Sequence, residues 1–270
     1  MNRLPISKQV QIINLLVEGN SLRATSRIAD VSINTVTKLL VSVGEACIKF
    51  HNEKVVNVKT RRIQCDEIWS FVYAKQKNLP EDKAGGDVWT WVGIDADTKL
   101  VVSWLIGLRD AETARVFIDD LASRISNRIQ LTTDGLRSYL EAVEQSFAND
   151  IDFAQLHKLY GGDPEAEKRY SPAECIGTRK VRVTGNPDKD HISTSYVERQ
   201  NLTMRMGMRR FTRLTNGFSK KIDNHCYAIA LHFVYYNFCR IHKTLRVTPA
   251  MEAGLTEDIM EIEDIIKLFR

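Results

Sequence analysis

The chain has 270 residues, of which 43% are hydrophobic, a share typical of a globular protein with a buried core. It contains no apolar run as long as a membrane span and no visible N-terminal signal peptide, which argues against a membrane or secreted protein. The formal net charge is +4, and the five cysteines are scattered without CxxC spacing. This cysteine usage predicts a reducing, cytoplasmic setting and argues against a disulfide framework or a zinc knuckle.

The first fifty residues predict a small helical module. Apolar side chains recur at helical spacing from Ile6 to Glu18, from Ser21 to about Ala29 and from Ile33 to Val43, where Gly44 would end the third helix. This pattern is typical of a helix-turn-helix DNA-binding domain over residues 1–50, although three-helix units also occur as plain packing modules. In a helix-turn-helix, the outward-facing side chains of the third helix would contact DNA. These are Asn34, Thr35, Thr37 and Lys38.

The central part of the chain predicts an α/β sheet. A basic linker, residues 51–62, is followed by IQCDEIWSFVY at Ile63 to Tyr73, whose β-branched and aromatic residues favour a strand. Strand-like runs at Val88 to Ile94 and Leu100 to Leu108 follow after short connections, which indicates an antiparallel meander. Two helices then alternate with two more strands, so we expect a mixed sheet with helices on both faces. The predicted helices are Asp110–Ser126 and Leu136–Phe147, and the predicted strands are Ile129–Thr133 and Ile151–Leu156.

The last part of the chain is predicted to be mainly helical. Residues 160–192 contain several glycines and prolines and read as an insertion, with a possible strand at Thr178 to Thr184. Helices are predicted at Ser193 to Arg210, at Phe218 to Arg240 and near the C-terminus. From Arg199 to Lys221 there are seven basic residues and no acidic residue. Such a block suggests contact with a polyanion, although a solvated helix face would look the same.

The predicted strand at Ile63 to Tyr73 carries two adjacent carboxylates, Asp66 and Glu67. Successive side chains of a strand point to opposite faces, so the two cannot do the same job. A charge in a buried strand is costly unless it is paired or binds a metal. An ion pair with an arginine and a metal site are therefore both open, and strand parity alone does not choose between the two acids.

Two later carboxylates favour a metal site. Asp134 lies where a strand gives way to a glycine and a helix, a position from which it could reach a neighbouring strand or cap the helix. Glu198 fits a capping box with Ser195, but it also shares a helix face with Arg205 and Arg209. Magnesium prefers oxygen ligands, and two such ions about 4 Å apart can support in-line displacement at phosphorus.

Three sequence blocks resemble the signature blocks of insertion-sequence transposases with a DDE triad. They are DEIWSFV at Asp66, TTDGLRSY at Asp134 and SYVERQN at Glu198. The match is closest to the IS-one type of family, and the tail HFVYYNFCRIHKTLRVTPA resembles the ending of many such transposases and integrases. The likeness covers roughly Arg62 to Ala250.

The resemblance implies an RNase H-like fold, expected over residues 63–215 and followed by a C-terminal helical segment at residues 216–270. It implies an enzyme that cuts and joins DNA with two divalent ions, Mg²⁺ or Mn²⁺. Asp66, Asp134 and Glu198 would be the catalytic metal ligands, which chooses Asp66 over Glu67. Arg205 would contact donor-end DNA. The other basic residues predicted to bind DNA are Arg199, Arg209 and Arg210.

The implied partners are DNA, as element ends and as target, and a second copy of the chain in a homodimer or larger assembly. The expected location is the bacterial cytoplasm, on the nucleoid when DNA is bound. Two other functions stay open: a helix-turn-helix regulator with a domesticated, non-catalytic domain, and an RNase H-like nuclease that cuts without joining. His191, His225 and His232 are left without a role, because lone histidines are usually structural or surface residues.

Overall fold

The computed structural model describes residues 4–161, 174–212 and 215–270. The chain starts with the helices α1 (Ile6–Val17), α2 (Leu22–Ile28) and α3 (Ile33–Lys54). The strands are β1 (Arg62–Val72), β2 (Gly86–Asp95), β3 (Val101–Gly107), β4 (Gln130–Asp134), β5 (Asp152–Gly161) and β6 (Glu174–Thr184). The helices α4 (Ala111–Arg124) and α5 (Ser138–Phe147) flank β4 in the sequence. The C-terminal part contains α6 (Ser195–Gly207), α7 (Ile222–Val234) with a π-helical turn at Tyr235–Cys239, α8 (Pro249–Glu252) and α9 (Ile262–Lys267).

The six strands form one mixed sheet in the order β3-β2-β1-β4-β5-β6. β1 lies between β2, which is antiparallel to it, and β4, which is parallel to it. The predicted meander of the first three strands is confirmed, and the mixed α/β architecture is consistent with the expected RNase H-like fold. The predicted insertion contributes β6, which starts earlier than the expected Thr178 and pairs with β5. Residues 162–173 of that insertion lie outside the described residues.

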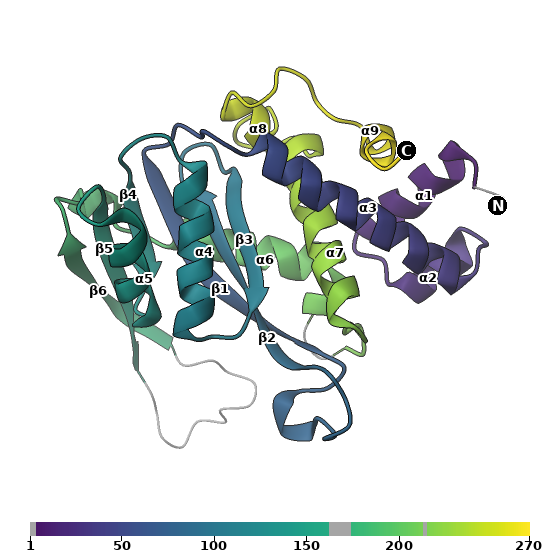
Figure 1. The fold of residues 1–270 in the computed structure, drawn as a ribbon, viewed down its shortest axis with the longest axis horizontal. Helices are drawn as coiled ribbons and strands as arrows, with labels where there is room; N and C mark the ends of the chain where they lie inside the picture. Colours follow the sequence, from purple (N-terminus) through teal and green to yellow (C-terminus); the bar gives the residue numbers. More distant parts are fainter. Residues whose placement is uncertain (1–3, 162–173, 213–214) are drawn as a thin grey trace.

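Helices cover both faces of the sheet, as predicted. The Gln64 side chain of β1 accepts the backbone N–H groups of Tyr196 and Val197, which anchors the start of α6 on one face. On the opposite face Glu67, which is three residues further along β1, accepts the Tyr139 hydroxyl of α5. Figure 1 shows α4 and α5 side by side across one face of the sheet. Because α5 and α6 cover opposite faces, they enclose the middle of β1 between them.

Helix α3 is longer than predicted. The expected end at Gly44 is wrong, because the helix continues to Lys54 and includes the first residues of the predicted linker. Gly44 instead lets α3 and α7 approach each other: a Cβ atom on Gly44 would lie 2.3 Å from the Cβ atom of Tyr227. One hydrophobic cluster joins side chains of α1, α3, the sheet, α7 and α9. The proposed domain boundaries at residues 50, 62 and 215 stay predictions.

The first three helices have the connectivity of a helix-turn-helix. Residues 29–32 join α2 to α3, and the two helices are bent by 115°, within the usual range of about 90–120° for this motif. Ser32 caps α3 by accepting the N–H of Thr35 at 3.1 Å. A DNA-binding role for this unit stays a prediction. Among the described residues no single helix is long and apolar enough to cross a membrane; only the bent pair α2 and α3, taken together, meets that test.

We predict that Gly44→Ala destabilises the protein. Alanine is the better helix former, but its Cβ atom would overlap Tyr227, and overpacking of this kind costs about 1–3 kcal/mol. Urea unfolding would measure the loss of stability. Lys49→Ala, at an exposed position of the same helix, is the matched control. A Gly44→Ala protein as stable as the control would contradict the close contact of α3 and α7.

Candidate functional site

The pairing of β1 with β4 brings acidic residues from distant parts of the chain together. Cys65 pairs with Thr133 in the parallel ladder, so Asp66 and Asp134 follow side by side. Gly135 leaves room next to them, because a Cβ atom there would lie 2.6 Å from Nδ1 of His157. Carboxylate oxygens of Asp66, Glu67 and Asp134 all lie within 4.8 Å of one another. The strand end is therefore a concentrated site of negative charge.

Glu67 is held by two partners. Its side chain is 1% exposed, and it accepts Nε of Arg109 at 2.6 Å and the Tyr139 hydroxyl at 3.2 Å. The same arginine places Nη2 3.6 Å from a carboxylate oxygen of Asp134. The ion pair with an arginine, one of the two possibilities left open by the sequence, is thus formed by Glu67. Its carboxylate nevertheless belongs to the same cluster as that of Asp66.

Asp66 is the acid whose ionisation is most disfavoured. Burial, followed by the negative charges of Glu67 and Asp134, raises the pKa of its carboxyl group to about 7. Burial is also the main cause that raises the pKa of Glu67 and of Asp134. Asp66 accepts one hydrogen bond at 2.9 Å from Nδ2 of Asn201 on α6. A cation in the cluster would relieve this repulsion.

Glu198 lies in the same cleft but outside the tight cluster. Its carboxylate accepts the Thr194 hydroxyl and forms an ion pair with Lys158, whose Nζ lies 2.5 Å from Oε2. The helix starts after Thr194, so the capping box expected with Ser195 is not formed. The negative charge of Glu198 still contributes to the raised pKa of Asp66.

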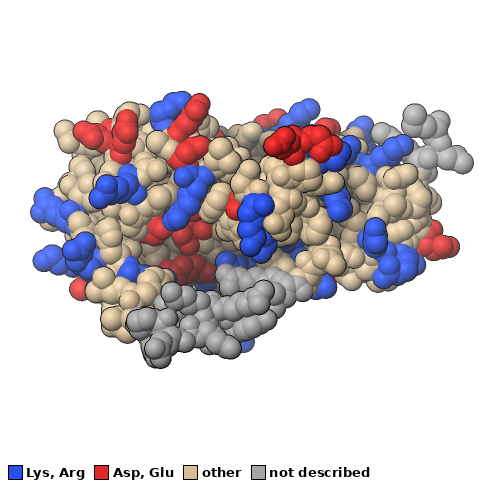
Figure 2. Space-filling view, turned by 90° about the horizontal axis from the view of Figure 1, so that it is seen from below, with Lys and Arg blue, Asp and Glu red and all other residues tan. Residues whose placement is uncertain are grey.

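The acidic cleft has a volume of about 880 Å³ and is lined by Asp66, Glu67, Asp134 and Glu198 together with basic residues. Figure 2 shows acidic side chains in a hollow of one face, with basic side chains around it. Asp134 accepts the N–H of Leu136 at 3.0 Å, but it does not cap a helix because α5 starts at Ser138. The three acids predicted from the sequence therefore share one cleft.

The predicted DNA-binding residues lie in different surroundings. Asn34, Lys38 and Arg199 are exposed, and Thr35 and Thr37 are half-buried on α3. Arg205 lines the acidic cleft. Arg209 and Arg210 line a second cleft, where Nη1 of Arg210 donates to the Ser219 hydroxyl at 2.9 Å and to the Asn224 carbonyl at 2.7 Å. Contact of these residues with DNA stays a prediction.

Of the three histidines without a role, His191 is exposed, whereas His225 and His232 are buried. Burial lowers the pKa of His225 to about 3 and that of His232 to about 4. Both imidazoles are therefore neutral at physiological pH.

Sequence reasoning missed several residues of the acidic cleft. The sequence favoured Asp66 over Glu67, although carboxylate oxygens of both acids lie within 4.8 Å of Asp134 at the end of β4. Asn201 was detectable, because it follows Glu198 by three residues and so shares its helix face. Arg109 and Lys158 gave no signal, since each reaches the acids only through the pairing of the strands.

The donor set of the acidic cluster suits a hard divalent cation. All three groups offer carboxylate oxygens, which Mg²⁺ and Mn²⁺ prefer over nitrogen or sulfur. Burial raises the pKa values of all three acids, and for Asp66 and Glu67 the neighbouring carboxylates raise them further, so a bound cation would favour their ionised forms. In the described part of the chain no other group of at least three such ligands converges as closely.

Comparisons with family models and with curated proteins find no match for this sequence. Among solved structures, the chain is similar to one titled "Cryo-EM structure of piggyBac transposase synaptic complex with hairpin DNA", with a TM-score of 0.43 and 8% identity over 98% of this chain and 69% of that chain. It is also similar to one titled "Crystal structure of the Mos1 Strand Transfer Complex", with a TM-score of 0.26 and 12% identity over 86% of this chain and 76% of that chain. At these TM-scores neither likeness supports a conclusion about activity.

The raised pKa of Asp66 predicts a pH-dependent gain of stability in Asp66→Asn. The folded protein keeps the Asp66 proton up to about pH 7, whereas the ordinary value is 3.8, so wild-type stability falls as the pH rises between these values. Asparagine has no such loss. The difference in melting temperature, Asp66→Asn minus wild type, should increase by at least about 2 °C between about pH 5 and about pH 8. Asp258→Asn, at an exposed position, is the control, and a difference that does not change with pH would contradict the assignment.

Divalent cations should stabilise the protein through the acidic cluster. A ligand that binds only the folded state at about 100 times its Kd adds about 2.7 kcal/mol. We expect Mn²⁺ to raise the melting temperature of wild type at about pH 8 and to have a much smaller effect on Asp134→Asn. EDTA-treated samples of both proteins, without added Mn²⁺, give the baseline melting temperatures. An equal shift in both proteins would place the bound ion elsewhere.

Proposed function

We propose that this protein is a DNA transposase of the DDE type, related to the IS-one type of insertion-sequence family. The observation that carries the proposal is the convergence of Asp66, Asp134 and Glu198 in one cleft from a central strand, a strand end and a helix start. This supports the assignment of the three sequence blocks to one site. The activity would be cleavage of DNA at insertion-sequence ends followed by strand transfer.

Asp66, Asp134 and Glu198 would hold two divalent ions, Mg²⁺ or Mn²⁺, with Glu67 next to them. Bound there, such ions stabilise the charge that develops on the attacking and leaving oxygens during displacement at phosphorus. Arg109 and Lys158 lie among the acids and would face the phosphate oxygens of the DNA. Fixed positive charges at such a position lower the free energy of the transition state.

The two steps of the reaction require the same geometry. In hydrolysis, water attacks phosphorus and the bond to the 3′ oxygen breaks, which leaves a free 3′-OH on the element end. In strand transfer, that 3′ oxygen attacks a phosphorus of target DNA, a new P–O bond forms and the target's own 3′ oxygen leaves. Water and the 3′-OH can share one site because both are in-line nucleophiles.

The rest of the chain would hold the DNA. The helix α3 would read the element ends through Asn34, Thr35, Thr37 and Lys38, and Arg199 and Arg205 would contact the backbone near the acids. Transposition needs the two element ends held together in one complex, so we expect a homodimer or larger assembly on DNA. The setting would be the bacterial cytoplasm.

One observation favours a second candidate function. Lys158 pairs with Glu198, and Arg109 pairs with Glu67, so the acids are partly neutralised by the chain's own cations. In a helix-turn-helix regulator with a domesticated domain, such ion pairs would suffice to neutralise the acids, and no metal ion would be needed. Such a protein would bind DNA and tolerate the loss of its carboxylates.

The proposal predicts that Asp66→Asn, Asp134→Asn and Glu198→Gln each reduce strand cleavage and joining by roughly 100-fold or more, because each removes charge stabilisation from the transition state. The assay uses labelled DNA with the element's own ends and Mg²⁺ or Mn²⁺. Binding of the same DNA should survive in all three variants. Glu53→Gln, an exposed acid on α3, is the control.

The alternatives have distinct outcomes in this assay. Cleavage without any joined product would indicate a nuclease. Specific binding without cleavage by wild type would indicate the regulator. Cleavage by all three variants at the wild-type rate would show that the acids are not the reaction site.

A further inference from the structure

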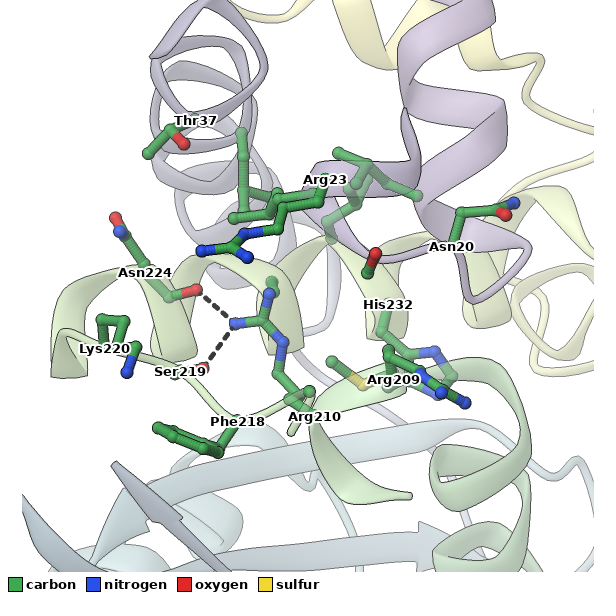
Figure 3. A pocket seen from close by; sticks show the side chains of 18 of the residues that line it. Asn20, Arg23, Thr37, Arg209, Arg210, Phe218, Ser219, Lys220, Asn224 and His232 are labelled. Carbon is green, nitrogen blue, oxygen red and sulfur yellow. Dashed lines mark hydrogen bonds between the residues drawn. The ribbon is translucent and has the colours of Figure 1, made fainter. Parts of the chain in front are cut away.

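A second cleft, of about 610 Å³, lies between the N-terminal helices and residues of two later segments, 207–210 and 216–232. Figure 3 shows Arg23 of α2 extending over the cleft toward Arg210, with Lys220 and Phe218 at one side. Apolar side chains from α1, α3 and α7 also line it, among them Leu16, Leu40 and Leu231. The cleft therefore combines a cationic rim with an apolar wall.

The positive charges of this cleft are not balanced by acidic residues. Arg23, Arg209, Arg210 and Lys220 line it, and none of the described residues that line it is an aspartate or a glutamate. Across residues 4–161, 174–212 and 215–270 none of these four side chains forms a salt bridge. Because like charges that face one hollow repel each other, an anion would stabilise their arrangement. Guanidinium groups are particularly suited to phosphate oxygens.

Arg210 is held in place by a chain of hydrogen bonds. It donates to the Ser219 hydroxyl, which lies 3.0 Å from Nδ1 of His225. Nε2 of His225 lies 3.1 Å from the Ser70 hydroxyl, which donates to the Val88 carbonyl. Since His225 is neutral, Nδ1 can accept from Ser219 while Nε2–H donates to Ser70. The guanidinium is thus fixed to the central sheet before any ligand arrives.

Two further side chains, those of His232 and Phe218, line the cleft. The His232 side chain is 5% exposed, and its Nε2 has no hydrogen-bond partner within the described part of the chain. A buried polar atom of this kind calls for an explanation. Phe218 packs against Phe71 with ring centroids 5.0 Å apart, and Nζ of Lys220 lies 4.4 Å from the centroid of the Phe218 ring. These contacts fix the aromatic ring and the cation beside each other at one side of the cleft.

We propose that this cleft binds a nucleotide unit, with the phosphate on Arg23, Arg210 and Lys220 and the base against Phe218 and the apolar wall. The unit could come from a DNA strand or from a free nucleotide, and the first source rests on the proposed function. The helix α6 connects the two clefts, with Glu198 in the acidic cleft and Gly207 in the cationic one. Nine residues of helix span about 14 Å, or roughly four steps of one strand of B-form DNA. A strand bound in the cationic cleft could therefore reach the acids.

The test measures binding of a fluorescein-labelled single strand to the full chain in EDTA, by anisotropy at several salt concentrations. Arg23→Ala and Lys220→Ala should each raise Kd about tenfold, because each removes one charged hydrogen bond to phosphate. Each should also reduce the slope of log Kd against log salt by about 0.7. Arg27→Ala, on the same helix but outside the cleft, is the matched control.

Competition with deoxyadenosine monophosphate separates the two sources. Displacement of the strand from wild type, together with weaker binding of the mononucleotide by Arg23→Ala, would show that a free nucleotide suffices. No displacement, with the losses in strand binding intact, would assign the cleft to a polymer. Variants that bind both probes like wild type, with an unchanged salt slope, would overturn the inference.

The outcome is independent of the acid variants. If Asp66→Asn abolishes cleavage while Arg23→Ala binds normally, the cleft assignment fails and the transposase proposal stands. If wild type never cuts but the cleft variants lose strand binding, the transposase proposal fails and the nucleotide site stands.

Discussion

The repulsion between carboxylates in the middle of β1 and at the end of β4 is the constraint on which the site depends. The parallel ladder forces Asp66 and Asp134 together, and Glu67 joins them from the opposite face of β1. The surrounding chain compensates with one arginine from the connection between β3 and α4, one tyrosine hydroxyl from α5 and one asparagine amide from α6. Even so, the acids keep raised pKa values. Keeping these carboxylates together therefore lowers the free energy of unfolding, and such perturbed acids are typical of functional sites.

The two clefts are held in a fixed relation by the packing of helices. Gly44 brings α3 against α7, and α7 carries His225, whose hydrogen bonds reach β1 through Ser70. The helix α6 is anchored on β1 by Gln64 and carries Glu198 and Asn201. The N-terminal helices are thus connected to the strand that bears Asp66 by packed side chains and hydrogen bonds, and not only by the chain between them.

The sequence predicted those features that depend on local pattern. Runs of β-branched, aromatic and other apolar residues located β1, β2 and β3, and the alternation of side chains along β1 correctly separated the faces of Asp66 and Glu67. Features that depend on contacts between distant segments were not predictable. Gly44 looked like a helix terminator because its partner, Tyr227, is far away in the sequence. Glu67 looked dispensable because Arg109 and Tyr139 meet it only in the folded chain. Likewise, no local pattern could show that Arg210 would turn inward to Ser219.

The raised pKa of Asp66 makes cation binding an exchange reaction. Near neutral pH a substantial fraction of the protein carries a proton on this carboxyl group, and an entering divalent ion must displace it. The apparent affinity for the ion should then increase as the pH rises toward and beyond about 7. If divalent ions bind at these acids as proposed, the pH of the surroundings would control how much of the protein carries them.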